Sequence, residues 1–339
     1  MNLSKNLAVG KPKKITEFSE WEALSEVSPK DRPWDTHRAF SDDVQGVLYR
    51  SDETDFKKQA LRISKCAQSL FFGWNANQET GECRLKLKTT FFCRVKSCSV
   101  CQWRRSLMWK ARFYQALPSV RKEHPTGRWL FLTLTVKNCA VDDLREQVKA
   151  MNEAFHRLVK RKEFADCLGW VRSFEVTRGE DGSAHPHFHV LMLVRPSYFK
   201  GTNYVSTGRW VEAWKGAMRL DYSPICHVKA VKVLRDADKE KFGEDAALAK
   251  AVAETLKYTV KSVEAVKDKD WFLAMLRQLH RMRALATGGV LKNAFRLEDE
   301  SQQDLLLGDE AGTVEEEPEA KVRFDWHHTK SQYRRKKQA

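Results

Sequence analysis

The chain has 339 residues, of which 42% are hydrophobic and 11% aromatic, which is enough for a sizeable core in one large domain or two ordinary ones. Sixty Lys and Arg residues against 45 Asp and Glu residues leave a formal charge of +15, which favours a polyanionic partner, most commonly nucleic acid. The longest apolar runs are far too short to cross a membrane, and residues 1–14 lack the apolar stretch of a signal peptide, so we expect a cytoplasmic protein with reduced cysteines.

Composition divides the chain into four regions. Residues 1–59 are mixed and polar and predict a loosely packed, partly flexible arm, and residues 60–127 are rich in cysteine and end in a basic and aromatic run. Residues 128–290 have the periodicity of a compact mixed domain. Residues 291–339 combine an acidic, unpatterned linker with a basic tail, and we expect both to be flexible.

The cysteine-rich region indicates a structural zinc site. Cys93, Cys98 and Cys101 lie within nine residues, and three thiols this close in a reducing compartment favour tetrahedral thiolate ligation of zinc. Cys66 and Cys83 compete for the fourth position.

Basic and aromatic residues alternate immediately after this cluster, in the run CQWRRSLMWKARFY at 101–114. Such a pattern suits phosphate contacts together with stacking on unpaired bases, although an amphipathic helix with buried tryptophans explains the aromatic residues equally well. We expect the basic side chains to contact DNA: Arg104, Arg105, Lys110 and Arg112.

The compact region predicts strands and helices in alternation. Strands are expected at 128–136, 169–177 and 187–194, the last two joined by a hairpin loop that contains Asp181-Gly182. Helices are expected at 141–164, at 245–267 and around 270–286, the last ended by Gly288-Gly289.

Three histidines alternate in the segment HPHFHVLML at 185–193. Alternate residues of a strand share a face, so His187 and His189 converge on one side while Phe188 packs into the core on the other. Imidazole pairs of this kind bind divalent transition ions. A hairpin that turns at Asp181 places Glu175 opposite His187 as the third ligand, with His185 as the alternative.

A tyrosine lies away from the apolar stripe of the helix predicted at 245–267. Glu254, Tyr258 and Lys261 share one helix face, which is either an ordinary solvated surface or a reactive group. Beside a metal ion, a phenol can attack phosphorus if a nearby ammonium, here Lys261, favours the phenolate, and Glu254 can activate water.

The segments FLTLTVKN (131–138), HPHFHVLML (185–193) and ETLKYTVK (254–261) resemble, in this order, the three motifs of HUH endonucleases. The chain is most similar to rolling-circle plasmid replication initiators of the Gram-positive-type group, over about residues 64–266. This resemblance implies an α+β fold with a central antiparallel sheet of ferredoxin or RRM type, helices and a small zinc-bound element. It also favours Cys66, in SKCAQSLFF, as the fourth zinc ligand.

The same resemblance implies a mechanism and partners. His187 and His189 would bind Mn²⁺ or Mg²⁺, Tyr258 would cut one DNA strand to form a 5′-phosphotyrosine link, and Glu254 would support hydrolysis of the closing junction. The DNA would be a plasmid origin, single-stranded at the nick, and a bacterial host helicase and DNA polymerase would follow. The sequence does not determine the oligomeric state, for which a dimer is one option.

Two other functions fit the same residues. A related HUH transposase or relaxase-like nickase would use the same site in another pathway. A non-catalytic zinc DNA-binding protein would carry the histidine strand as a purely structural element.

Overall fold

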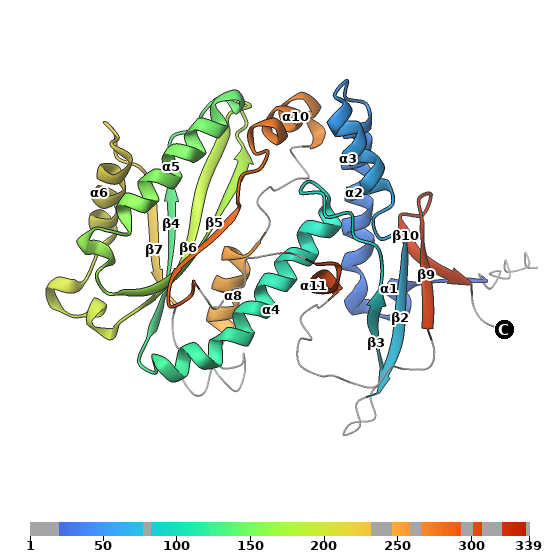
Figure 1. The fold of residues 1–339 in the computed structure, drawn as a ribbon, viewed down its shortest axis with the longest axis horizontal. Helices are drawn as coiled ribbons and strands as arrows, with labels where there is room; N and C mark the ends of the chain where they lie inside the picture. The colour runs from blue at the N-terminus through green and yellow to red at the C-terminus, as the bar shows by residue number, and fades with distance from the viewer. Residues whose placement is uncertain are drawn as a thin grey trace, which may run out of the picture.

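The computed structural model describes residues 20–76, 83–231, 246–257, 266–292, 301–306 and 321–336. Within these ranges the protein is α+β, with helices packed around two five-stranded antiparallel sheets (Figure 1). No helix in the described part of the chain is long and apolar enough to span a bilayer.

The first sheet is central to the candidate site and has the strand order β7-β4-β6-β5-β8. Its strands are β4 (Arg128–Thr135), β5 (Cys167–Arg178), β6 (Ala184–Val194), β7 (Cys226–Ala230) and β8 (Leu285–Gly289). Together with α5 (Leu144–Leu158) and α6 (Thr207–Met218), the chain order β4-α5-β5-β6-α6-β7 is that of a ferredoxin-like βαββαβ unit. The expected α+β fold with a central antiparallel sheet is therefore confirmed.

Helices α5 and α6 cover one face of this sheet. Phe188 is fully buried there, with its ring centroid 6.0 Å from that of Phe155 on α5 and 6.2 Å from that of Trp214 on α6. His187 and His189 therefore point to the opposite face, because neighbouring residues of a strand alternate sides. On that face, apolar residues of α4 (Ser99–Glu123) and α8 (Ala246–Thr255) pack over Leu191 and Leu193.

The segment after α10 (Lys269–Gln278) differs from its prediction. A helix was expected to continue to about residue 286, but the chain leaves α10 and forms β8, which pairs antiparallel with β5 from Gly169 to Ser173. Gly288 makes this pairing possible, because a Cβ atom there would lie 2.4 Å from the Trp170 ring. The glycines therefore permit an edge strand and do not terminate a helix.

The second sheet joins both ends of the described chain, in the order β1-β10-β9-β2-β3. Its strands are β1 (Trp21–Ala23), β2 (Ser69–Ala76), β3 (Cys83–Thr89), β9 (Lys321–His327) and β10 (Gln332–Lys336). The helices around it are α1 (Leu24–Val27), α2 (Pro33–Tyr49), α3 (Thr54–Ser64) and α11 (Gln302–Leu306), and α4 runs from this half of the molecule to the first sheet (Figure 1).

Short 3₁₀ helices complete the described elements. They span Pro29–Asp31, Val141–Asp143, Lys162–Phe164, Pro196–Phe199 and Gly201–Asn203.

The second sheet corrects two expectations about the ends of the chain. Residues 321–336 were expected to be a flexible tail, but Phe324, Trp326 and Tyr333 alternate with polar residues and are buried against the rest of the sheet. The expected loose arm contains α2 and α3, whose buried residues include Trp34 and Leu48. Apolar and polar residues alternate in this basic segment, and such a period of two residues is the signal for a half-buried strand. The prediction of a flexible tail relied on net charge and missed this alternation.

Candidate active site

Glu175, His187 and His189 converge on one face of the first sheet. The predicted register is confirmed: Glu175 pairs with His187 across the β5–β6 ladder, and Ser173 pairs with His189. Oε2 of Glu175 lies 3.2 Å from Nε2 of His187 and 3.0 Å from Nε2 of His189. One carboxylate oxygen and two ring nitrogens, all within 4.8 Å of one another, are a donor set that fits a divalent ion such as Mn²⁺.

Burial makes this group of donors unusual. Glu175 is 1% exposed and His189 5% exposed, so the carboxylate has lost almost all contact with water. Burial alone would raise the pKa of Glu175, but hydrogen bonds from His187, His189 and Lys257 hold it well below the ordinary range. Burial lowers the pKa of His189, although its bond to Glu175 opposes this shift. A buried carboxylate beside neutral imidazoles is the protonation state in which all three can bind a cation.

Two neighbours orient His189. Oγ1 of Thr133, opposite His189 on β4, lies 3.4 Å from Nδ1, and the ring of Phe131 stacks on the imidazole at a centroid distance of 5.6 Å. A partner on Nδ1 leaves Nε2 turned toward Glu175, which is the usual arrangement around a metal-binding histidine.

His185 lies at the edge of this group. Its Nδ1 is 2.6 Å from the side-chain oxygen of Asn138, and its ring centroid is 5.2 Å from that of His187. Among the described residues, the groups of side chains that could hold a metal include His187 and His189 but not His185. The geometry therefore favours Glu175 over His185 as the third donor.

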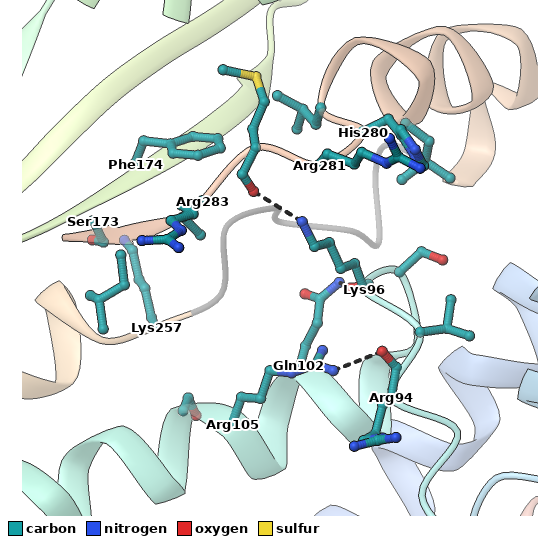
Figure 2. Close-up of a pocket in the computed structure, with 18 of the residues that line it drawn as sticks. Arg94, Lys96, Gln102, Arg105, Ser173, Phe174, Lys257, His280, Arg281 and Arg283 are labelled. Atoms are coloured by element: carbon teal, nitrogen blue, oxygen red, sulfur yellow. Dashed lines mark hydrogen bonds between the residues drawn. The ribbon is translucent and has the colours of Figure 1, made fainter. Parts of the chain in front are cut away.

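Lys257 completes the site and was not singled out from the sequence. Its ammonium lies 2.8 Å from Oε2 of Glu175 and also contacts Glu254, whose own Oε1 is 3.8 Å from Nε2 of His189. Burial opposes its charge, but the hydrogen bonds to both carboxylates raise the pKa of Lys257 overall. Figure 2 shows Lys257 next to Ser173 of β5.

The signal for Lys257 was its position three residues after Glu254, a spacing at which helical side chains meet. The structure brings Glu254 to the histidines from the C-terminal end of α8. Tyr258 and Lys261 lie outside the described residues.

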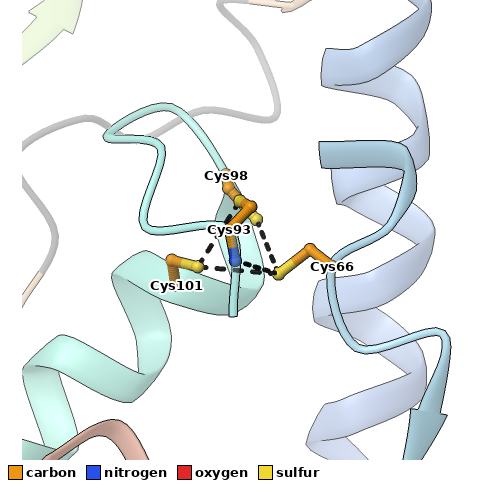
Figure 3. A group of neighbouring side chains, drawn as sticks. All are labelled: Cys66, Cys93, Cys98 and Cys101. Carbon is orange, nitrogen blue, oxygen red and sulfur yellow. Dashed lines mark hydrogen bonds between the residues drawn. The ribbon is translucent and has the colours of Figure 1, made fainter. Parts of the chain in front are cut away.

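Four cysteines form a second cluster, between α3 and the start of α4 (Figure 3). The Sγ atoms of Cys66 and Cys101 are 3.6 Å apart, and those of Cys93–Cys101 and Cys66–Cys98 are each 3.7 Å apart. A tetrahedral zinc site with Zn–S bonds of about 2.3 Å needs sulfur separations of about 3.8 Å, so the thiols are placed for zinc. Cys83 is exposed on β3 and takes no part, which supports Cys66 as the fourth ligand.

Backbone amides also surround the thiols. The amides of Cys93, Arg94 and Val95 point at Sγ atoms of the cluster at 3.3–3.5 Å. Burial disfavours ionisation of Cys98, but hydrogen bonds from the other three thiols lower its pKa well below the usual value, whereas hydrogen bonds within the cluster and burial raise the pKa of Cys66 and of Cys101. Such donors stabilise thiolates, which are the form that ligates zinc.

The four basic residues predicted to contact DNA have different environments. Arg104 is buried and donates to the carbonyls of Leu305 and Leu306, so it fastens α11 to α4, which argues against a phosphate contact. Arg112 pairs with Asp304 at 2.9 Å. Arg105 donates to the carbonyl of Arg94, and Lys110 is half-buried on the same helix.

Comparison with known proteins finds relatives that match most of this chain. A family model described as "Replication protein" matches residues 84–334. The chain is 34% identical to the "Protein rep" of Lentilactobacillus hilgardii and 35% identical to that of Lactiplantibacillus plantarum, in each case over 90% of this chain and 95% of the relative. It is 36% identical to the "Protein rep" of Bacillus amyloliquefaciens over 76% of both chains, and no solved structure matches. The chain therefore belongs to the Rep family of replication proteins, as its three motifs indicate.

Proposed function

We propose that this replication protein starts rolling-circle replication of a plasmid by cutting one strand of the origin DNA, with Tyr258 as the nucleophile. The observation that carries this proposal is the meeting of Glu175, His187 and His189 on one sheet face, with Glu254 3.8 Å from His189. Tyr258 follows Lys257 directly in the sequence, and Lys257 contacts Glu175. The proposed nucleophile is therefore one residue from a side chain that is part of the site.

Glu175, His187 and His189 would hold Mn²⁺ or Mg²⁺. When bound, the ion would supply positive charge that polarises the scissile phosphate. Thr133 and Phe131 keep the His189 ring in its orientation, and Lys257 contributes a fixed positive charge where the anionic strand approaches.

In the first step the phenol oxygen of Tyr258 forms a bond to phosphorus and the bond to the 3′ oxygen breaks, leaving a free 3′ hydroxyl and a 5′-phosphotyrosine. Lys261 favours the phenolate. The new ester keeps the energy of the phosphodiester, so a later attack by a 3′ hydroxyl can reseal a strand. In the last step Glu254 takes a proton from water, and the water oxygen bonds to the phosphorus of the closing junction while the bond to the 3′ oxygen breaks. The leaving 3′ oxygen takes up a proton, so the products are a 3′ hydroxyl and a 5′ phosphate.

The protein would act in the cytoplasm of its bacterial host, where a helicase and a DNA polymerase would extend the free 3′ end. The Cys66, Cys93, Cys98 and Cys101 cluster would bind zinc and stabilise the fold without taking part in the chemistry.

The experiment is incubation of the protein with supercoiled DNA that carries the origin, in Mn²⁺ or Mg²⁺. The wild type should yield nicked circles and a covalent adduct, and mass spectrometry of the DNA-linked peptide should identify Tyr258. Tyr258→Phe should form neither product. An adduct with Tyr258→Phe would remove Tyr258 from the mechanism, and no nicking at all by the wild type would favour a non-catalytic DNA-binding protein.

Glu254→Ala separates this function from transposition or conjugative nicking. The variant should nick at the wild-type rate but fail to terminate, so that multimeric strands accumulate. Normal termination by Glu254→Ala would exclude its role as a base.

A further inference from the structure

A cavity of about 640 Å³ opens beside the metal-binding face (Figure 2). Its walls come from α3, the loop between Cys93 and Cys98, α4, the middle of β5, the end of α8, and α10 with the segment that follows it. The volume is in the range of about 300–1,000 Å³ that is typical of small-ligand sites.

The lining combines an apolar part with positive charge. The apolar part includes the side chains of Phe56, Trp109, Phe174, Leu256, Phe272 and Leu279. The positively charged lining residues are Arg62, Arg94, Lys96, Arg105, Lys257, Arg281 and Arg283. No described residue of the lining is Asp or Glu. A ligand that fits both properties has a flat apolar group and a negative charge, as a nucleotide does.

The cavity shares a wall with the candidate active site. Lys257 lines the cavity while its ammonium lies 2.8 Å from Glu175. Ser173 also lines it, and the backbone of Ser173 pairs with that of His189. Figure 2 shows Arg283 beside Ser173 and Lys257, so a group bound here would adjoin a phosphate bound at the histidines.

The cysteine cluster holds the opposite wall in place. The loop between Cys93 and Cys98 projects Lys96, whose ammonium donates to the carbonyl of Met282 at 3.0 Å. Gln102 on α4 donates to the carbonyl of Lys96 at 2.6 Å. The segment that carries Arg281 and Arg283 is in turn fixed to β5, because the amide of Phe174 donates to the carbonyl of Ala284.

We propose that this cavity binds the nucleotide that adjoins the cut phosphate, with its base in the apolar part. Two successive phosphates of the strand would lie against Arg283, beside Ser173 and Lys257, and Arg281, beside His280. This inference rests on the proposed function. It also makes the loop between Cys93 and Cys98 part of the DNA-binding site. A base inside the cavity must be unstacked, so the ligand is a single strand, and base–aromatic stacking of about 1–3 kcal/mol would support it. A free nucleotide has the same chemistry and is the other source to be tested.

The test is equilibrium binding of a fluorescent single-stranded oligonucleotide with the origin sequence, measured by anisotropy without added Mn²⁺ or Mg²⁺ and without a chelator, over a series of salt concentrations. Arg281→Gln with Arg283→Gln should lower the slope of log K against log salt by about 1.4, because each phosphate contact of a single strand contributes about 0.7. At 0.1 M salt the same relation predicts binding about 25-fold weaker.

The matched control removes two charges on the opposite side of the sheet. Lys160→Gln with Lys162→Gln changes two exposed lysines in the turn after α5, the helix that packs on Phe188, and should leave the slope unchanged. Gln59→Trp, which fills the cavity from α3 without removing a charge, should weaken binding while the slope stays that of the wild type. Circular dichroism confirms that each variant is folded.

The proposal is overturned if the Arg281 and Arg283 variant keeps the wild-type slope, or if Gln59→Trp binds as tightly as the wild type. A second arm adds thymidine 5′-monophosphate as a competitor. Displacement of the oligonucleotide by micromolar competitor would assign the cavity to a free nucleotide and overturn the strand assignment; no displacement at that level supports it. Because no Mn²⁺ or Mg²⁺ is added to support cutting, these results do not depend on whether Tyr258 is the nucleophile.

Discussion

The carboxylate of Glu175 is almost fully buried, yet one of its oxygens accepts from two imidazoles and an ammonium. A carboxylate removed from water is costly unless positive or hydrogen-bonding groups surround it. Lys257 supplies that positive charge in the metal-free protein, and a divalent ion would supply it when bound. The stability of the sheet should therefore depend, through Glu175, on whether Lys257 or a divalent ion neutralises the carboxylate.

Lys257→Met tests this coupling. Removing one partner of a buried ion pair leaves the other charge uncompensated, so without added Mn²⁺ the variant should lose about 3 kcal/mol of unfolding free energy. Saturating Mn²⁺ should recover most of this loss, because the ion takes over the charge of the ammonium. Thermal unfolding with and without Mn²⁺ measures both effects.

Lys250→Met is the matched control, since Lys250 is an exposed lysine of α8, the helix that ends just before Lys257. It should unfold like the wild type in both conditions. Equal losses for Lys257→Met with and without Mn²⁺ would show that Lys257 and the ion do not share a site.

The pH dependence of metal binding follows from His189. Metal binding requires neutral imidazole, and burial lowers the pKa of His189 below its ordinary value of 6.5. Mn²⁺ affinity should therefore persist below pH 6.5 before it declines. For the same reason the metal-free protein should lose stability as the pH falls through 6.5, because the unfolded chain takes up a proton that the folded state resists.

Mn²⁺ titration followed by electron paramagnetic resonance at pH 5 to 8 checks this expectation. His189→Gln should abolish binding, whereas His185→Gln should retain it, since His185 bonds to Asn138. Loss of binding in His185→Gln would exchange the roles of His185 and Glu175.

At the scale of elements, the cysteine cluster joins segments that sequence spacing alone does not connect. Three of its thiols come from a nine-residue stretch at the start of α4, and the fourth, Cys66, follows α3. The local stretch was recognisable from its spacing. Whether Cys66 or Cys83 is the fourth member of the cluster depends on where α3 packs, which the spacing of the cysteines does not show. The resemblance to the family favoured Cys66.

Cys66→Ser should lower bound zinc below one equivalent per chain and destabilise the protein, because binding of structural zinc contributes to folding. Cys83→Ser should leave both zinc content and melting temperature unchanged, since Cys83 is exposed on β3. Metal analysis and thermal unfolding of the two variants give the comparison. A full equivalent of zinc in Cys66→Ser would refute the four-cysteine assignment.

At the scale of the whole molecule, the second sheet pairs strands from the two ends of the described chain. Strands β9 and β10 insert between β1 and β2, and the hydroxyl of Ser69 donates to Asp325, 256 residues away. The aromatic side chains of Phe324, Trp326 and Tyr333 enter the core that also contains Trp34 and Phe72. The C-terminal strands are therefore part of the unit that supports the cysteine cluster.

Deleting residues 321–339 tests this role. Each of the three aromatic side chains contributes about 1.5–3 kcal/mol by burial, so the shortened protein should melt at a much lower temperature or aggregate. A chain that ends at residue 336 is the control and should unfold like the full chain. An unchanged melting temperature after the larger deletion would restore the interpretation of this segment as a flexible tail.

The sequence by itself determined the features that depend on local periodicity. Alternation places Phe188 and the two histidines on opposite faces, and a hairpin at Asp181 sets Glu175 against His187, because strand period and turn position are properties of adjacent residues. The order of the three motifs also indicated the family. These signals need no knowledge of how distant segments pack.

Only the tertiary structure decided the remaining features. In the folded chain the ammonium of Lys257 contacts Glu175, and buried Arg104 donates to the carbonyl of Leu305 in α11. The segment after α10 pairs with β5 as strand β8, and β9 pairs with β2. Each of these depends on contacts between segments far apart in the sequence, where burial and pairing outweigh local propensity. Charge and composition predicted a loose chain at both ends because neither records which apolar residues meet across such distances.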